Sequence, residues 1–392
     1  MLDISKRLQQ ISESQTVALT SLLLQMKRDG QDVVSLGAGE PDFQTPSHVK
    51  RAGIQAIKSD DTKYTAVSGI FELRQAITNW IEQEYGARYT PDNIVVTCGA
   101  KHAIYQSLMA ICDPGDEILV PAPYWVSYPE QIKLAGGIFK PLWPDTHDLK
   151  ITAAHLEKVI SSTTKVLILN SPTNPTGAVY SKRELDDIAG VIAQSGIFVI
   201  SDEIYDQIVY DAPFASLAVY DNIREQLVYV NGVSKSFAMT GWRIGFAAAD
   251  KRIAAAIVKY QGHSMTHPAT ISQRAAQTAY QSEKNFIKEM LAAYQKRRDY
   301  VMQRLSAMPH VKCAPPQGTF YAFPEVSSYY NRDMGINDSM ALCYYLLQHS
   351  GVAIVPGAAF GMDAHVRLSF ATSMNTLEMA FDRLESGLQS LL

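Results

Sequence analysis

Val166-Leu167-Ile168-Leu169 lies near the middle of the chain and contains no polar residue that could face solvent. A strand that is apolar on both sides is typical of a mostly parallel sheet covered by helices on both faces. Similar runs alternate with helix-like segments at Ile94–Thr97, Glu117–Val120, Phe198–Ile200, Leu227–Val230 and Ile244–Ala247. The sequence therefore predicts an α/β architecture.

Composition limits the classes of function. The chain has 392 residues, of which 47% are hydrophobic, so it can bury a large core and divide into more than one domain. The net charge of -4 offers no basic surface for nucleic acid or an anionic membrane. No apolar run approaches membrane-spanning length, and the first residues lack the apolar region of a signal peptide. Four scattered cysteines predict neither a metal site nor disulfides, which favours a reducing, cytoplasmic compartment.

The alternation of apolar runs and helix-like segments gives way to a different sequence pattern in the second half of the chain. Residues 285–308 are charged and periodic, which predicts a long helix leading from a large domain into a C-terminal one. Two strand candidates follow, Phe320–Phe323 and Val366–Phe370, with a helical pattern between them. Helix starts are predicted from two capping-box spacings, Ser181 with Glu184 and Asn375 with Glu378.

The chemistry centres on Ser234-Lys235-Ser236-Phe237-Ala238-Met239-Thr240-Gly241-Trp242-Arg243. A lysine in a desolvated pocket can attack a carbonyl, and the planar fork of an arginine suits a phosphate dianion. Two further motifs each follow an apolar run, Asn170-Ser171-Pro172-Thr173-Asn174-Pro175-Thr176-Gly177 and Ser201-Asp202-Glu203-Ile204-Tyr205. Together these motifs predict a Schiff-base lysine with a phosphate anchor nearby.

This order of motifs resembles the class I aminotransferases that carry pyridoxal 5'-phosphate (PLP). The resemblance runs from Gly37–Phe43 to Arg367–Ser369 and is greatest for aspartate-type members with Tyr-Trp-Val-Ser-Tyr and Thr-Gly-Trp-Arg signatures. It implies the fold type I of PLP-dependent transferases, with a mostly parallel sheet in a large domain at residues 48–290. A smaller α+β domain would combine residues 1–47 and 291–392. It also implies a homodimer with active sites at the interface.

The resemblance assigns roles around the cofactor ring. Lys235 matches the lysine that binds the cofactor aldehyde and then moves a proton as general base and acid. Asp202 matches the carboxylate that pairs with the pyridine nitrogen. Tyr205 resembles the phenol at the ring oxygen, with Asn174 as its companion, and Trp125 resembles the aromatic residue that stacks on the ring. Alone, Asp202 could equally be a helix cap and Asn174 part of an ordinary turn.

The segment Cys98-Gly99-Ala100-Lys101 follows a predicted strand and is expected to begin a helix. The backbone N–H groups at the start of that helix would face a phosphate. Arg243 would add a two-point contact, and Tyr64 would reach in from the neighbouring subunit. The further residues expected to bind the cofactor are Gly99, Ala100, Lys101, Ser234, Arg243 and Tyr64.

Substrate recognition is expected from a second set of residues. Arg367 matches the arginine that grips the substrate α-carboxylate, a task suited to its planar fork. Lys101 and Thr16 match a pair that binds the distal carboxylate of dicarboxylic substrates in one subgroup, although Lys101 could instead neighbour the phosphate or be solvated. The residues expected at the substrate are Gly39, Trp125, Asn174, Arg367, Lys101 and Thr16.

The predicted reaction is transamination of aspartate and 2-oxoglutarate to oxaloacetate and glutamate, with prephenate to arogenate as a further reaction of this subgroup. The alternatives are an aminotransferase for aromatic amino acids or alanine, and a PLP-dependent lyase on the same fold. A PLP-sensing regulator would need a DNA-binding module, and none is predicted. Two positions depart from the family: Gly232 replaces a serine that touches the phosphate in several relatives, and His267 replaces serine or asparagine near the site entrance, with a role left open.

Overall fold

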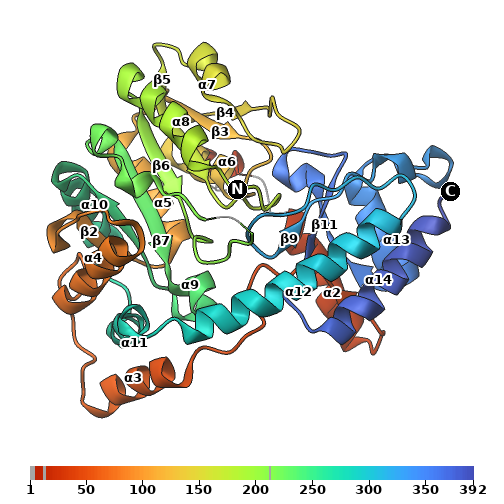
Figure 1. The fold of residues 1–392 in the computed structure, drawn as a ribbon, viewed down its shortest axis with the longest axis horizontal. Helices are drawn as coiled ribbons and strands as arrows, with labels where there is room; N and C mark the ends of the chain where they lie inside the picture. Colours follow the sequence, from red (N-terminus) through yellow and green to blue (C-terminus); the bar gives the residue numbers. More distant parts are fainter. Residues whose placement is uncertain (1–4, 12–14, 212) are drawn as a thin grey trace.

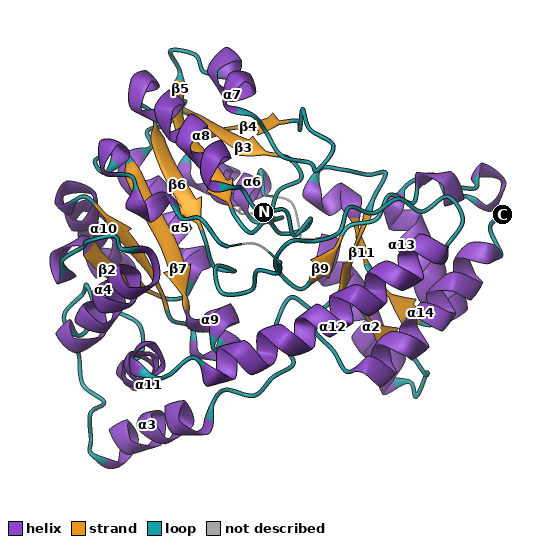
Figure 2. Ribbon diagram, viewed as in Figure 1, coloured by secondary structure: helices purple, strands orange, loops and turns teal. Residues whose placement is uncertain are grey.

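The computed structural model describes residues 5–11, 15–211 and 213–392, and for residues 15–19 it describes the backbone alone. Within these residues, seven strands form the central sheet, and Figures 1 and 2 show helices packed around it. In spatial order they are β2 (Ile94–Thr97), β8 (Gly245–Ala249), β7 (Leu227–Gly232), β6 (Phe198–Asp202), β5 (Thr164–Asn170), β3 (Glu117–Pro121) and β4 (Ile138–Leu142). Only β8 runs antiparallel to its neighbours, so the predicted mostly parallel α/β sheet is confirmed.

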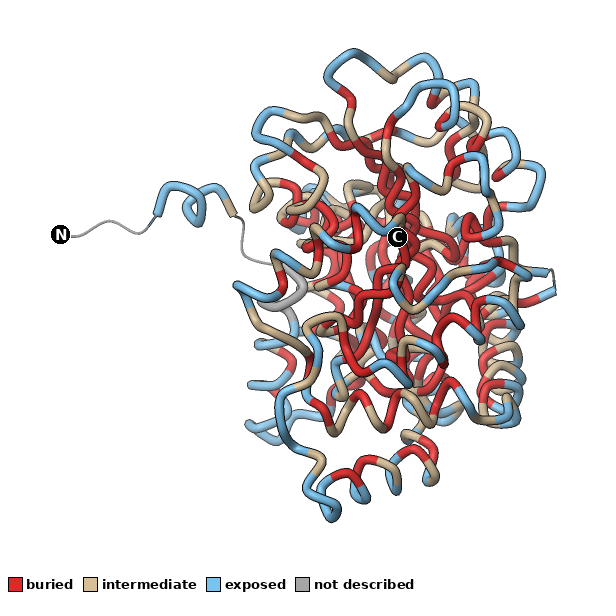
Figure 3. The backbone as a smooth tube through the Cα atoms, turned by 90° about the vertical axis from the view of Figure 1, so that its left-hand side faces the viewer, coloured by how far each residue is buried: buried red, intermediate tan, exposed pale blue. Residues whose placement is uncertain are grey.

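The sheet is buried on both faces because successive side chains of a strand point to opposite sides. Leu167 of β5 packs into one hydrophobic cluster and Ile168 into the other, and both are fully buried. The cluster of Ile168 extends into a second group of elements beside the sheet, and the helices that cover this face of the sheet within it are α5 (Ala100–Ile111), α6 (Tyr128–Ala135) and α10 (Lys251–Ser264). Those on the opposite face are α4 (Phe71–Tyr85), α7 (Ala153–Val159), α8 (Lys182–Ser195) and α11 (Thr270–Gln281). The buried strands form the continuous core seen in Figure 3.

A second group of elements lies beside the sheet. Its antiparallel strands are β11 (Val355–Pro356), β12 (Val366–Ser369) and β9 (Tyr321–Ala322), while β1 (Val34–Ser35) pairs with β10 (Val352–Ala353). The helices are α13 (Ser339–Ser350), α14 (Met374–Gln389) and α2 (Gln15–Arg28). Residues from both ends of the chain therefore meet here. The predicted long helix is α12 (Asn285–Ala307), which links this group to the sheet (Figure 1).

The other α-helices of the described residues are α1 (Lys6–Gln9), α3 (Ser47–Lys58), which packs on α11, and α9 (Val233–Ser236). Within the described ranges, no helix is both long and apolar enough to cross a membrane.

One predicted helix start is confirmed and the other is wrong. Ser181 and Glu184 form the capping box of α8. The cap of α14 is instead Ser373, two residues before the predicted one, because its side chain accepts a hydrogen bond from the N–H of Thr376 at 3.1 Å. Asn375 therefore lies within the first turn, where it cannot act as the cap.

Candidate active site

The candidate site lies at the carboxyl ends of the parallel strands, where ligands of open α/β sheets bind. A cavity of about 620 Å³ opens there between the central sheet and the second group of elements. It brings together most of the residues predicted from the sequence: Gly39, Ala100, Lys101, Trp125, Asn174, Asp202, Tyr205, Ser234, Lys235, Arg243 and Arg367.

Lys235 reaches this cavity because α9 begins directly after β7. Its Nζ donates a hydrogen bond to the carbonyl of Gly39 at 2.5 Å and lies 5.7 Å from the ring centroid of Tyr205. Burial, helped by the positive charge of Arg367, lowers the pKa of Lys235 to about 8. A larger fraction of this amine is therefore neutral and nucleophilic at physiological pH than in a free lysine.

Asp202 is the last residue of β6 and is 4% exposed. Tyr128 donates its hydroxyl to Asp202 Oδ2 at 2.6 Å, and the N–H of Ile204 reaches Oδ1 at 3.3 Å. Burial raises the pKa of Asp202 to about 6, while the hydrogen bond from Tyr128 acts in the opposite direction. Asp202 is thus mainly ionised at neutral pH and is suited to pair with a cationic ring nitrogen. The sequence reasoning missed Tyr128, although it ends the Tyr-Trp-Val-Ser-Tyr signature.

Arg367 is a buried guanidinium on β12. It donates to Asn174 Oδ1 at 3.1 Å and to the carbonyl of Gly37 at 3.0 Å, and its plane lies 4.3 Å from the ring centroid of Tyr321. Its Nε is buried and has no hydrogen-bond partner among the described residues. The hydroxyl of Tyr321 in turn lies 2.9 Å from that of Tyr205. These contacts use two of the five N–H donors of the guanidinium and hold it in place, so donors remain for an anion. Tyr321 was not singled out from the sequence as a site residue.

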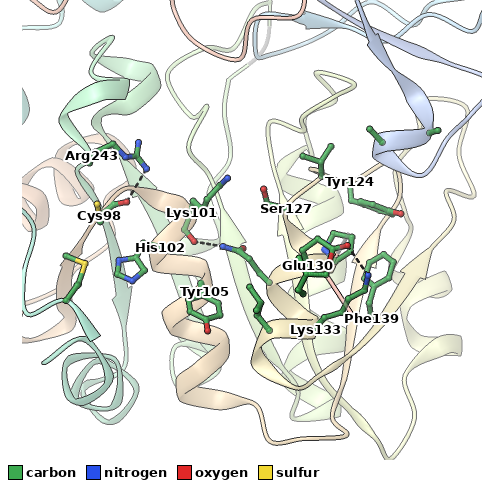
Figure 4. Close-up of a pocket in the computed structure, with 18 residues that line it drawn as sticks. Cys98, Lys101, His102, Tyr105, Tyr124, Ser127, Glu130, Lys133, Phe139 and Arg243 are labelled. Carbon is green, nitrogen blue, oxygen red and sulfur yellow. Dashed lines mark hydrogen bonds and ion pairs between the residues drawn. The ribbon is translucent and has the colours of Figure 1, made fainter. Parts of the chain in front are cut away.

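The start of α5 forms an anion cradle. Gly99 is the N-cap with φ +83°, and no side chain caps this helix. Arg243 donates to the carbonyl of Cys98 at 3.2 Å, as Figure 4 shows, and to that of Thr240 at 2.9 Å. A Cβ on Gly99 would lie 2.6 Å from Arg243 Nη2, so only glycine lets the guanidinium approach the helix start. The backbone N–H groups at the start of α5 and the positive charge of Arg243 therefore face the same anion-binding space.

Lys101 also borders a second cavity of about 900 Å³, which shares Lys101, Val126, Ser127 and Arg243 with the first. The Lys101 amine lies 4.9 Å from the centroid of Trp125, and its pKa is lowered by burial and by Arg243. Figure 4 shows this cavity between α5 and α6, with aromatic side chains that include Tyr105, Tyr124 and Phe139 along its wall.

Comparison with known proteins places this geometry in a family. The family model for aminotransferase class I and II matches residues 31–384. The chain belongs to the class I and II aminotransferases. This aminotransferase is 40% identical over 387 residues to the aspartate aminotransferase of Bacillus sp. (strain YM-2), covering 97% of this chain and 98% of the relative. It is also 40% identical to the bifunctional aspartate aminotransferase and glutamate/aspartate-prephenate aminotransferase of Petunia hybrida, covering 100% and 84% of the two chains.

Solved structures agree with this assignment. The aspartate aminotransferase from Rhizobium meliloti superposes with a TM-score of 0.95 at 36% identity and covers 99% of both chains. The aspartate aminotransferase from Thermus thermophilus with maleate gives a TM-score of 0.93 at 38% identity, covering 99% of this chain and 100% of that one. The predicted fold type I of PLP-dependent transferases is confirmed by these neighbours.

Among the predicted site residues that the structure describes in full, two do not line the cavity of this single aminotransferase chain: Gly99, which is the N-cap of α5, and Tyr64. Tyr64 is 88% exposed and lies outside the lining. Thr16 lies in α2, but its side chain falls outside the described residues.

Gly232, which departs from the family pattern, has no room for a side chain, because a Cβ there would lie 2.8 Å from the backbone of β8 at Gly245.

Proposed function

We propose that this aminotransferase uses PLP to transfer the amino group of aspartate to 2-oxoglutarate, giving oxaloacetate and glutamate. The observation that carries the proposal is the convergence of Lys235, Asp202 and Arg367 on one cavity of about 620 Å³. An amine of lowered pKa, a buried carboxylate and a guanidinium with an unpaired Nε are the groups that such a reaction needs. The names of the Bacillus and Petunia relatives support aspartate as the donor.

The residues present fit PLP. Arg243 and the uncapped start of α5 would hold the phosphate, and the Gly99 position, where a Cβ would meet the Arg243 guanidinium, is the feature that permits it. Asp202 would pair with the pyridine nitrogen, and Tyr205 would bind the ring oxygen. Bound PLP would supply an aldehyde for the amino group and a ring that withdraws electrons from the α-carbon.

The other steps belong to the side chains of this protein. Arg367 would bind and orient the α-carboxylate, since its remaining contacts to Asn174 and Gly37 fix the guanidinium. Lys235 would then remove the proton from the α-carbon as general base and return it as general acid, a role for which a pKa of about 8 is well placed. Lys101 would attract the distal carboxylate of a dicarboxylic substrate.

We also propose the organisation that the family resemblance implied. Residues 48–290 would form the large domain, and residues 1–47 and 291–392 the small one. Two copies would form a homodimer in which Tyr64 of one chain completes the phosphate site of the other, and the 88% exposure of Tyr64 supports this role. Four free cysteines agree with a reducing cytoplasm.

Prephenate is a second candidate amino acceptor. The cavity of about 900 Å³ beside Lys101 offers an aromatic wall, including Tyr124 and Phe139, to a ring that also carries a carboxylate. The printed name of the Petunia relative includes this activity. Steady-state assays with prephenate and glutamate or aspartate would decide the point, and absence of arogenate formation would remove prephenate from the substrate range.

The test of the main proposal is the absorption spectrum of PLP-loaded protein before and after aspartate, with Lys235→Ala beside the wild type. We expect aspartate to convert the wild-type cofactor band to the amine form, and 2-oxoglutarate to restore it, while Lys235→Ala does not cycle. Conversion by alanine or an aromatic amino acid but not by aspartate would refute the dicarboxylate assignment. Failure to bind PLP at saturating cofactor would refute the whole proposal.

A further inference from the structure

The segment 62–69, between α3 and α4, carries the exposed Tyr64. Side chains from residues 261–273 tie it to the body of the protein. The N–H of Thr65 donates to His267 Nε2 at 3.1 Å, and the rings of His267 and Tyr64 meet edge to face with centroids 5.7 Å apart. The flanking bonds join Thr270 Oγ1 to the Lys63 carbonyl, Gln261 Nε2 to the Val67 carbonyl and the Ile70 N–H to Gln273 Oε1.

These contacts specify one form of the His267 ring. A backbone N–H can only donate, so Nε2 must be the acceptor and must carry no proton. Nδ1 lies 2.7 Å from the carbonyl of Pro268, which can only accept, so Nδ1 carries the hydrogen. His267 is therefore held as the neutral Nδ1–H tautomer, with both nitrogens used and its ring face fixed against Tyr64.

The backbone next to His267 is held in an unusual conformation. Thr266 has φ +70°, which is an outlier for a β-branched residue. Its N–H donates to the carbonyl of Gln261 at 2.9 Å, and the N–H of His267 donates to Met265 at 3.0 Å. Strain of this kind persists where the surrounding structure imposes it, and here it aims the half-buried His267 ring at the segment of Tyr64.

The geometry points to His267 as the positioning residue of Tyr64. His267 acts at two places at once, through the hydrogen bond to the Thr65 N–H and through the ring contact with Tyr64. The other bonds hold residues 63, 67 and 70 and, through a 3.4 Å contact from Gln273 Nε2, the side chain of Thr65, but none of them touches Tyr64. The inference rests on the proposed function, in which Tyr64 reaches the phosphate site of a second copy. Restricting the Tyr64 ring before the two copies meet lowers the entropy lost when its hydroxyl binds the phosphate.

The experiment measures the dissociation constant of PLP by spectral titration of the apoprotein. The variants are Tyr64→Phe, His267→Phe, their double mutant, and His267→Gln. Phenylalanine keeps an aromatic ring and removes the acceptor of Thr65, while the glutamine amide oxygen has a reach comparable to that of Nε2. His263→Phe, on the exposed last turn of α10, is the matched control. If His267→Phe does not fold, His267→Leu replaces it.

We expect Tyr64→Phe to weaken PLP binding about tenfold or more, because a hydrogen bond to a charged group is lost. His267→Phe should weaken it about three- to tenfold. The double mutant should bind no more weakly than Tyr64→Phe. His267→Gln, which restores the acceptor for Thr65 but not the ring, should recover part of the affinity that His267→Phe loses. The control should leave the dissociation constant unchanged.

Other outcomes distinguish the positioning role of His267 from the phosphate-binding role of Tyr64. If Tyr64→Phe weakens binding but His267→Phe does not, the inference about His267 fails and the proposed role of Tyr64 stands. Full additivity in the double mutant, or no rescue by His267→Gln, would also overturn the inference. An unchanged affinity for Tyr64→Phe would remove the role of Tyr64, and the role of His267 with it.

Discussion

Replacing Tyr128 by phenylalanine should change the pH range in which this protein binds PLP. The substitution removes one hydroxyl that donates to Asp202 Oδ2 at 2.6 Å and leaves the buried ring in place. Asp202 is proposed to pair with the pyridine nitrogen only while it is ionised. As the pH falls through its pKa, the carboxylate takes up a proton and this contribution to PLP affinity is lost.

The size of the pKa change of Asp202 follows from the hydrogen bond that Tyr128 donates to it. A hydrogen bond to a charged group contributes about 1.5–3 kcal/mol, and one pKa unit corresponds to about 1.4 kcal/mol. Loss of the Tyr128 hydroxyl should therefore raise the pKa of Asp202 by about 1–2 units, from about 6. At pH 7 the ionised fraction of Asp202 would fall from about nine tenths to about half or less.

The assay is the dissociation constant of PLP measured from pH 5.5 to 9. The acid-side loss of affinity should move upward by about 1–2 units in Tyr128→Phe relative to wild type. Tyr210→Phe is the control, because it removes an equally buried hydroxyl that donates to the carbonyl of Thr319 outside the cavity lining. An unchanged midpoint in Tyr128→Phe, or the same movement in Tyr210→Phe, would refute the reasoning.

Three further substitutions test the other parts of the site. Arg367→Lys should raise the KM for aspartate about tenfold or more in a coupled assay, because a point charge replaces the planar fork; an unchanged KM would contradict α-carboxylate binding. Gly99→Ala places a Cβ 2.6 Å from Arg243 Nη2 at φ +83° and should weaken PLP binding about tenfold in the spectral titration. Gly190→Ala, which meets nothing within 4 Å, should not. Lys101→Ala should raise the KM of aspartate and 2-oxoglutarate but not of alanine, and an equal rise for all three would argue against distal-carboxylate recognition.

Most of the central sheet could be predicted because its signal is local. A run such as Val166–Leu169 is apolar on both sides only if both faces are covered, and β5 indeed packs into both clusters. The edge strand β4 was missed for the converse reason. Ile138 is 45% exposed, and the strand contains Pro141, so neither the apolar pattern nor the strand propensity of a central strand is present.

Local sequence was sufficient for the α/β class and the capping box of α8, since each depends on residue type and short spacing, and the order of motifs along the chain made Lys235 a candidate. Only the tertiary structure brought Gly39 to Lys235, across 196 positions, and Gly37 to Arg367, across 330. It alone decided the Tyr128–Asp202 pair, the neutral tautomer of His267 and the opposite pKa shifts of Lys235 and Asp202. Burial and through-space contact set these properties, because they depend on which distant segments exclude water from a group and face its charge.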